Sequence, residues 1–344
     1  MAHWPGPWRR EEMGWIFPRR ATGALIGVLT VASLLTSACA NNAADNDGDL
    51  GKLSQMTMAT GSTGGTYFPL GGGIAQLWSN EIKGLRVTTQ ATGASVENLR
   101  LLKSGEVELV MSTNGVGTMA LAGDGEFKGE KHDFVALGNI YPEVLQIVAT
   151  EKSGIKTVED MKGKRVALGP PGSGTEVTAK QVLGHYGLDP ENDVKPFSDT
   201  FADAATKLQD GAIDAAFTVL SLPAAAILDV ATSSKIRIVE ITGPNLDKLL
   251  KEDPSFSTLE IPANTYPGQA KAAQTVTNWA TLYGLPGLDE EQVYQLVKVL
   301  YEKGSGIEHS VAEQITLDTA LEGLGETKLH PGAERYFKEK GALD

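Results

Sequence analysis

The chain contains little cysteine, few aromatic residues and no excess of positive charge. Cys39 is the only cysteine in 344 residues, so no disulfide can form within the chain. Lysine and arginine number 30 against 43 aspartate and glutamate, and the net charge of −13 makes nucleic acid a poor partner. The histidines show no paired metal-ligand spacing, and we expect no metal site at His3, His132, His185, His309 or His330.

Long apolar runs are also scarce, and the clearest one lies near the N-terminus. Arg19 and Arg20 precede an apolar stretch over residues 21–35, which is too short to span a bilayer comfortably and ends in small residues. A charged segment, an apolar run and a small-residue cleavage site predict an export signal over residues 1–39, with Met13 as an alternative start. Its removal takes away four arginines and two glutamates, which leaves a net charge of −15.

Cys39 stands at the end of this predicted signal. The segment Leu35-Thr36-Ser37-Ala38-Cys39 resembles a bacterial lipobox, although Thr36 occupies a position where an aliphatic residue is usual. We therefore predict lipidation at Cys39 and a location on the extracytoplasmic face of the cell membrane; the alternative is that Cys39 is discarded with the signal peptide. The polar residues 40–53 read as a flexible tether.

Beyond the tether, short apolar strands alternate with amphipathic helices, the pattern of an α/β fold with a mostly parallel sheet. In the first half, strands are expected at 56–59, 85–90 and 107–112, with helices over 70–85 and 96–103. In the second half, strands are expected at 165–168, 193–197 and 213–219, with helices over 176–186 and 203–208. The two halves therefore predict two similar α/β lobes.

Extended segments define the predicted lobe boundaries. Residues 145–149 read as a crossing from the first lobe to the second, and the chain after residue 244 crosses back. A strong helix over 290–302 is expected to pack on the first lobe. The prediction is a discontinuous first lobe, 54–144 with 250–344, and a second lobe, 145–249.

Two glycine-rich turns each follow a predicted strand and open a predicted helix. They are Thr60-Gly61-Ser62-Thr63-Gly64-Gly65-Thr66-Tyr67 and Gly169-Pro170-Pro171-Gly172-Ser173-Gly174-Thr175-Glu176. A helix start has unpaired N–H groups and partial positive charge, and glycine lets a ligand approach the backbone closely. Ligands of open α/β sheets bind beyond the carboxyl ends of strands, where both turns lie. The turns predict a cleft that closes on a small carboxylate.

The second turn nearly matches a phosphate-binding P-loop and fails at two positions. Thr175 stands where the lysine is required, and Glu176 stands where a hydroxyl would hold magnesium. A carboxylate there would repel a triphosphate. No nucleophile motif with a suitably placed histidine is evident, so we expect no catalytic residue and no cofactor.

The candidate ligand-binding residues come from these turns, from neighbouring helix starts and strand ends, and from three tyrosines in loops or crossings. The alternative for each is an ordinary turn, capping or packing role. The predicted set is Ser62, Thr63, Gly65, Thr66, Tyr67, Ser95, Asn98, Thr113, Asn114, Tyr141, Gly172, Ser173, Gly174, Thr175 and Tyr266.

Five segments together resemble the TAXI solute receptors of tripartite ATP-independent periplasmic (TRAP) transporters, over essentially all of residues 54–340. They are the first glycine turn continued to Gly72, Ala91-Thr92-Gly93-Ala94-Ser95-Val96-Glu97-Asn98, the second glycine turn, Ile261-Pro262-Ala263-Asn264-Thr265-Tyr266-Pro267-Gly268, and His330-Pro331-Gly332-Ala333. The resemblance implies a two-lobe fold of the periplasmic-binding-protein kind (type II), with a hinge and an interlobe cleft.

The resemblance also implies that the protein binds a ligand and catalyses no reaction. Such a receptor captures an organic acid or an amino acid such as glutamate or glutamine, and delivers it to an ion-gradient-driven TRAP membrane permease. It would hold the carboxylate with hydroxyls and backbone amides, and neither glycine turn contains arginine. Two alternatives stay open at this point: an exported transferase or hydrolase on the same two-lobe fold, and a ligand-sensing subunit of a membrane signalling protein.

Overall fold

The computed structural model describes residues 49–344, which form ten strands and nine α-helices. The predicted signal peptide, Met13, Cys39 and the part of the tether up to residue 48 lie outside the described residues. The first part of the described chain forms β1 (Gln55–Ala59), α1 (Tyr67–Glu81), β2 (Arg86–Gln90), α2 (Ser95–Ser104), β3 (Leu109–Thr113), α3 (Asn114–Ala122) and the long β4 (Val135–Thr150).

The second part repeats the alternation of strand and helix. It forms β5 (Arg165–Ala167), α4 (Gly174–His185), β6 (Lys195–Phe197), α5 (Phe201–Gln209), β7 (Ala215–Leu220), α6 (Ala225–Ser233) and β8 (Ile236–Val239). The chain then continues through α7 (Gly243–Glu252), β9 (Ser257–Ile261), β10 (Ala273–Gly284), α8 (Glu290–Lys303) and α9 (Pro331–Glu339). The alternation predicted from sequence is confirmed.

The first helix differs most from its prediction. The pattern placed the first helix over 70–85, whereas α1 begins at Tyr67 and ends at Glu81. Ile82 and Leu85 are buried, so they continue the apolar pattern. The chain between them has already left the helix, because Gly84 adopts a φ of +82° and turns it toward β2.

Two long strands join the two halves of the sheet. The strand order is β2-β1-β3-β10-β4-β7-β5-β6, with β8 beside β4 and β9 beside β10. The pairs among β1, β2 and β3 and among β5, β6 and β7 are parallel, whereas β10 runs antiparallel to both β3 and β4. The first part of β4 pairs with β10 and its last part, from Val144, pairs with β7. The predicted extended crossing at 145–149 is therefore part of β4.

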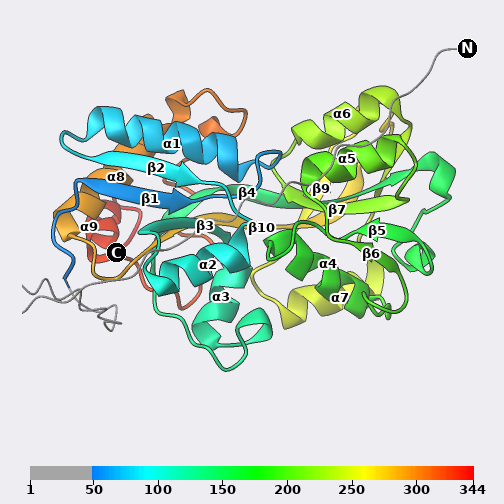
Figure 1. Ribbon diagram of the computed structural model, residues 1–344, viewed down its shortest axis with the longest axis horizontal. Helices are drawn as coiled ribbons and strands as arrows, with labels where there is room; N and C mark the ends of the chain where they lie inside the picture. Colours follow the sequence, from blue (N-terminus) through cyan, green and yellow to red (C-terminus); the bar gives the residue numbers. More distant parts are fainter. Residues whose placement is uncertain (1–48) are drawn as a thin grey trace, which may run out of the picture. The chain divides into compact units, whose positions relative to one another are not determined.

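Each half has its own hydrophobic core. One cluster gathers Met58, Leu70 and Trp78 with Leu296 and Phe337, so α8 and α9 complete the core around β1 to β3. We call β1–β3 with α1–α3, α8 and α9 the first lobe (Figure 1). The indole N–H of Trp78 donates to the carbonyl of Leu296 at 2.8 Å and fixes α8 against α1. The predicted packing of the 290–302 helix on the first lobe is confirmed.

The other half is built around two clusters on the opposite faces of β7 and its neighbours. They draw on Leu145, Phe217 and Val276 on one face and on Leu220 and Tyr266 on the other. We call β5–β8 with α4–α7 the second lobe (Figure 1). β9 and the first part of β10 also supply residues to these clusters. The lobe boundaries drawn from sequence, after residues 144 and 249, stay predictions.

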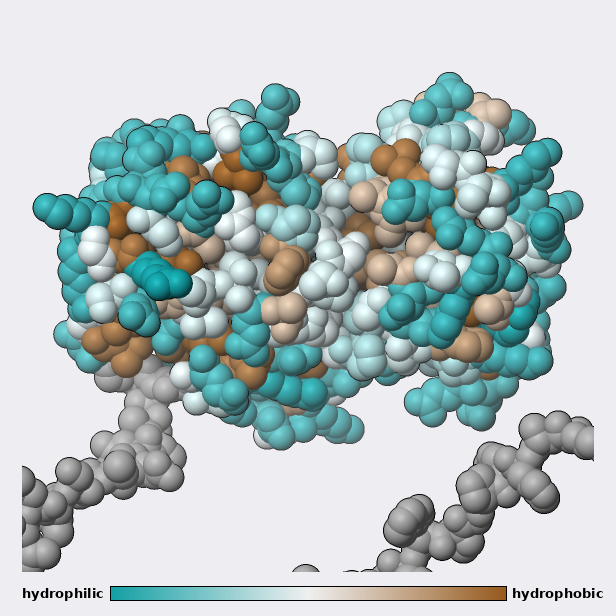
Figure 2. All heavy atoms as spheres, turned by 45° about the horizontal axis from the view of Figure 1, so that its top comes forward, coloured by the Kyte–Doolittle hydropathy of each residue, from teal (hydrophilic) through white to brown (hydrophobic). Residues whose placement is uncertain are grey.

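On the face that Figure 2 shows, hydrophilic residues cover much of the rim of both lobes, with hydrophobic residues scattered among them. Paler residues of intermediate hydropathy fill the zone between them. No helix within residues 49–344 combines the length and the apolarity needed to cross a membrane.

Candidate functional site

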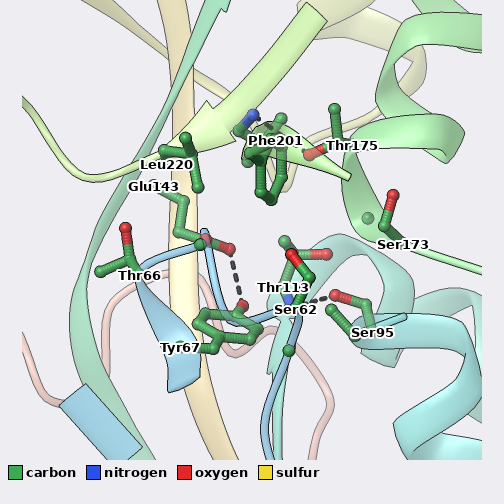
Figure 3. A pocket seen from close by; sticks show the side chains of 15 residues that line it. Ser62, Thr66, Tyr67, Ser95, Thr113, Glu143, Ser173, Thr175, Phe201 and Leu220 are labelled. Carbon is green, nitrogen blue, oxygen red and sulfur yellow. Dashed lines mark hydrogen bonds between the residues drawn. The ribbon is translucent and has the colours of Figure 1, made fainter. Parts of the chain in front are cut away.

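A small pocket lies between the lobes, and both glycine turns reach it (Figure 3). The first lobe supplies residues around the starts of α1 and α2 and the end of β3. The second lobe supplies the start of α4, Phe201 at the start of α5 and the end of β7. The lining residues are Gly61, Ser62, Gly65, Thr66, Tyr67, Ala94, Ser95, Thr113, Glu143, Ser173, Gly174, Thr175, Phe201, Val219 and Leu220.

Four helices begin at this pocket. Their first residues are Tyr67 of α1, Ser95 of α2, Gly174 of α4 and Phe201 of α5, and all four line it. Helix N-termini carry partial positive charge and backbone N–H groups that lack partners within the helix. The pocket therefore gathers dipoles that favour a negatively charged group without a cationic side chain.

The first glycine turn places an unpaired hydroxyl in the wall of the pocket. Ser62 Oγ is buried and has no hydrogen-bond partner among the described residues. The turn closes through Gly65, whose N–H donates to the carbonyl of Ser62 at 2.9 Å. A Cβ on Gly65 would lie 3.1 Å from the ring of Phe201, so the absence of a side chain lets the second lobe approach. A buried hydroxyl without a partner is a group that a ligand can satisfy.

The second glycine turn forms the start of α4. Gly169 and Gly172 adopt φ values of +107° and +71°, which favour glycine. Ser173 caps the helix by accepting the Glu176 N–H at 3.0 Å. Thr175 Oγ1 accepts the Val219 N–H at 3.1 Å. The oxygens of both side chains are therefore used as acceptors, and their hydroxyl protons are left to donate.

The lobes also contact each other directly at the edge of the pocket. The N–H groups of Val96 and Glu97, at the start of α2, donate to the carbonyl of Gly172 at 2.9 and 3.3 Å. Thr66 Oγ1 accepts the N–H of Ser221, which follows β7, at 3.2 Å. These bonds run from the first lobe to the second. They show the lobes in contact around the pocket.

Glu143 is the one charged residue that lines the pocket within the described part of the chain. The residue is 3% exposed, and its carboxyl group accepts hydrogen bonds from the hydroxyls of Tyr67 at 2.7 Å and Tyr141 at 3.1 Å. Burial raises the pKa of Glu143 to about 7, against the opposing effect of the two hydroxyls. Burial also holds the pKa of both tyrosine hydroxyls well above its usual value, so they remain donors.

Nine of the fifteen residues predicted from sequence line the pocket. Both glycine turns contribute, as do the start of α2 and the end of β3, and Figure 3 shows the labelled residues around a common space. The nine are Ser62, Gly65, Thr66, Tyr67, Ser95, Thr113, Ser173, Gly174 and Thr175.

Three of the other predicted residues do not line the pocket and instead form hydrogen bonds within the first lobe or on β4. Asn98 donates to the carbonyls of Thr60 and Met111 from inside the first lobe. Asn114 donates to the carbonyl of Gly323. Tyr141 is buried and donates to Glu143.

The remaining three predicted residues, Thr63, Gly172 and Tyr266, also do not line the pocket. Thr63 is exposed on the first turn. Gly172 supplies the carbonyl that α2 binds. Tyr266 contacts Gln146 through its hydroxyl, which also accepts the N–H of Ala224 at 2.9 Å.

Sequence reasoning missed six lining residues, of which Glu143 matters most. The others are Gly61, Ala94, Phe201, Val219 and Leu220. A signal for Glu143 was present, because a single acidic residue interrupts the apolar run of β4. An acid within a buried strand is unusual and points to a site. Within residues 49–344, no cluster of His, Cys, Asp and Glu is arranged to hold a metal ion.

Residues 58–341 match the NMT1-like family. The chain belongs to the NMT1-like family. Solved structures similar to it include a protein from Bordetella bronchiseptica RB50, at 19% identity and a TM-score of 0.51 over 83% of this chain and 82% of that one. The alkanesulfonate-binding protein SsuA from Xanthomonas axonopodis pv. citri, bound to MOPS, is also similar, at 18% identity and a TM-score of 0.46 over 84% of each chain.

An ancestral arginine-binding protein bound to arginine is similar at 18% identity and a TM-score of 0.42, over 77% of this chain and 97% of that one. At such identities a likeness concerns the fold alone. The predicted α/β fold with two lobes is confirmed by the sheet order and the separate cores. The expectation of a mostly parallel sheet is wrong, because five of the nine strand pairs in the described residues are antiparallel.

Proposed function

We propose that this NMT1-like protein is an extracytoplasmic solute receptor that binds a small carboxylate between its lobes. The observation that carries the proposal is the pocket itself, which both lobes line with hydroxyl groups and helix N-termini. An anion held there is neutralised by dipoles and hydrogen bonds from both sides. Because both lobes contact it, the ligand favours the state in which they are closed.

We further propose that the receptor is of the TAXI kind and delivers its ligand to a TRAP membrane permease. The five sequence segments quoted above support this assignment. The proposal includes removal of residues 1–39, lipidation at Cys39 and residence on the extracytoplasmic face of the cell membrane. Vesicles that contain the permease should take up ligand when an ion gradient and this protein are both supplied, without ATP. Uptake that requires ATP would contradict the TRAP assignment.

Ligand binding should stabilise the purified protein. A ligand present at a hundred times its Kd adds about 2.7 kcal/mol to the free energy of unfolding. We therefore expect a rise of several degrees in Tm with one class of small carboxylates, in a thermal-shift screen of amino acids and organic acids. Uncharged sugars at the same concentrations are the control. If no carboxylate raises Tm, the proposed function is wrong.

The Ser62→Ala variant should weaken binding without weakening the fold. Ser62 Oγ has no partner among the described residues, so its loss breaks no hydrogen bond in the free protein. Loss of one hydrogen bond to a charged ligand lowers affinity by about tenfold or more. Isothermal titration calorimetry measures the affinity and thermal melting checks the fold. Ser104→Ala, on the exposed end of α2, is the matched control.

Ser62 is a better test than Ser173 because Ser173 caps α4. Removal of that cap costs about 1 kcal/mol of stability whether or not a ligand binds there. If Ser62→Ala binds the carboxylate as tightly as the wild type, Ser62 does not contact the ligand.

A further inference from the structure

Helices α2 and α4 begin close together across the pocket but are capped differently. A Cβ on Gly174 of α4 would lie 2.9 Å from Ser95 Oγ of α2. At the start of α4, Ser173 Oγ accepts the N–H of Glu176, as a serine N-cap normally does. At the start of α2, the equivalent position is Ala94, which has a methyl side chain and a φ of +89°, and no side chain caps this helix. The first N–H groups of α2 therefore need an acceptor from elsewhere.

The second lobe supplies that acceptor. The carbonyl of Gly172 accepts the N–H groups of Val96 and Glu97 at 2.9 and 3.3 Å. These are the second and third residues of α2, the positions whose N–H groups an N-cap side chain satisfies. A backbone carbonyl of the second glycine turn thus takes the place of a capping side chain from the first lobe. When the lobes separate, both N–H groups lose this partner.

Glu176 fixes the glycine that carries this carbonyl. Its Oε2 accepts the N–H of Gly172 at 2.9 Å, and its Oε1 lies 3.0 Å from Nζ of Lys180, one turn further along α4. Lys180 Nζ also lies 3.9 Å from Oε1 of Glu126, which belongs to the first lobe. Gly172 adopts a φ of +71°, and glycine has wide backbone freedom. The carboxylate of Glu176 removes much of that freedom at the position that faces α2.

This arrangement gives a role to the acid that breaks the P-loop pattern of the second turn. Ser173 and Glu176 have the spacing of a capping box, in which the acid normally accepts the N–H of the N-cap residue itself. In this turn, Glu176 instead accepts the N–H of the preceding residue, Gly172. The bond therefore holds the residue whose carbonyl reaches the first lobe.

We propose that closure of the lobes completes α2: the Gly172 carbonyl is its N-cap, and Glu176 is the positioning residue that presents this carbonyl. Ala94 and Ser95, at the start of α2, line the pocket. One wall of the pocket is therefore ordered by the second lobe and reaches its final form only when the lobes meet. This inference goes beyond the proposed function, because it concerns closure and holds for any ligand.

The test locks the lobes together without a ligand. Gly64→Cys and Ala202→Cys are introduced into the full chain together with Cys39→Ser, which removes the only native cysteine. The two Cβ atoms would lie 3.1 Å apart, slightly closer than the usual disulfide separation of about 3.5–4.5 Å. Gly115→Cys with Ser255→Cys, whose Cβ atoms would lie 3.4 Å apart, is a second pair that joins the lobes. Mass spectrometry confirms the cross-link.

Hydrogen–deuterium exchange at the N–H groups of Val96 and Glu97 is then measured residue by residue. We expect exchange at least about tenfold slower in the oxidised form than in the reduced form, because the cross-link prevents the opening that removes the cap. In the oxidised protein, Glu176→Ala should restore exchange to within about threefold of the reduced form. Glu176→Gln should keep the protection, because its amide oxygen can still accept the N–H of Gly172. Glu159→Ala, an exposed acid of the second lobe, is the matched control.

Each outcome decides the inference. Equal exchange in the oxidised and reduced forms would overturn it, and so would full protection in oxidised Glu176→Ala, because Glu176 would then cap α4 alone. Failure of both cysteine pairs to oxidise would overturn it as well, since the lobes would not meet as described. If Glu176→Ala fails to fold, the comparison of oxidised and reduced protein still decides. No ligand is used, so a failure of carboxylate binding would remove the proposed function and leave this result standing.

Discussion

The Glu143→Gln variant should be more stable than the wild-type protein at pH 8, by about 3 kcal/mol in the absence of ligand. The reason is the raised pKa of the Glu143 carboxyl, which burial moves from 4.5 to about 7. Each unit of such a shift corresponds to about 1.4 kcal/mol of stability lost by the charged form. Glutamine has the same shape and no charge to bury. Its amide can accept from one tyrosine hydroxyl and donate to the oxygen of the other.

The same shift gives the wild-type protein a defined pH dependence. Between pH 4.5 and about 7 the folded state holds a proton on Glu143 that the unfolded state has lost. The free energy of unfolding therefore contains a contribution that is full below pH 4.5 and is lost as the pH rises through 7. Ligand-free Glu143→Gln lacks this pH-dependent contribution. The difference in free energy of unfolding between the variant and the wild type should therefore grow as the pH rises from 4.5 to about 7.

Urea denaturation of both proteins at several pH values between 4.5 and 8 measures this difference. Glu106→Gln, whose side chain is exposed, should follow the wild type. If Glu143→Gln is less stable than the wild type at pH 8, Glu143 is not a buried, uncompensated charge. A higher free energy of unfolding for Glu143→Gln would fit a role of Glu143 in binding, because residues retained for binding often reduce stability.

The Gly93→Ala variant should keep its fold and lose at least about a hundredfold in ligand affinity. A Cβ on Gly93 would lie 2.2 Å from the carbonyl oxygen of Pro171, which belongs to the second glycine turn, and 2.9 Å from Glu97 Oε2. The first of these contacts lies between the lobes and involves a backbone atom that cannot rotate away. The lobes must then separate, and the apparent affinity falls with the fraction of molecules that can close.

Calorimetry measures the affinity of Gly93→Ala, and small-angle scattering measures its radius of gyration with saturating ligand. Gly184→Ala is the matched control, because Gly184 lies within α4 and its added Cβ would meet nothing within 4 Å. We expect similar Tm values for both ligand-free variants, since each lobe has its own core. Wild-type affinity in Gly93→Ala would show that closure at Pro171 is not needed for binding.

Much of the fold could be predicted from sequence because it follows local patterns. Apolar strands with a glycine turn and a helix after them gave β1 with α1 and β5 with α4 in their correct order. The crossing at 145–149 was also recognisable, because a long apolar run after Tyr141-Pro142 suits a buried strand. The pairing of β10 between β3 and β4 could not be predicted, since strand partners far apart in sequence leave no local signal.

The candidate site was predictable to the extent that it consists of turns. Seven lining residues of the two turns were identified because glycine turns at helix starts have a recognisable composition; they are Ser62, Gly65, Thr66, Tyr67, Ser173, Gly174 and Thr175. Asn98 and Asn114 are also polar residues near helix starts, yet their side chains donate to backbone carbonyls and do not line the pocket. A polar side chain near a helix start can line a pocket or bind a backbone carbonyl. Only the three-dimensional structure distinguishes these two roles. Glu143 was missed because its importance depends on the two hydroxyls around it and on a pocket lining that includes no cationic side chain among residues 49–344.

The packing of Tyr336 and Phe337 in the core of the first lobe has a consequence for biosynthesis. The core that begins with Met56 includes residues of α9, so a nascent chain cannot finish this lobe before the ribosome reaches α9. Leu145 to Val276 supply the core of the other lobe and are all made earlier. The second lobe can therefore mature first, while the first lobe waits for the synthesis of α9.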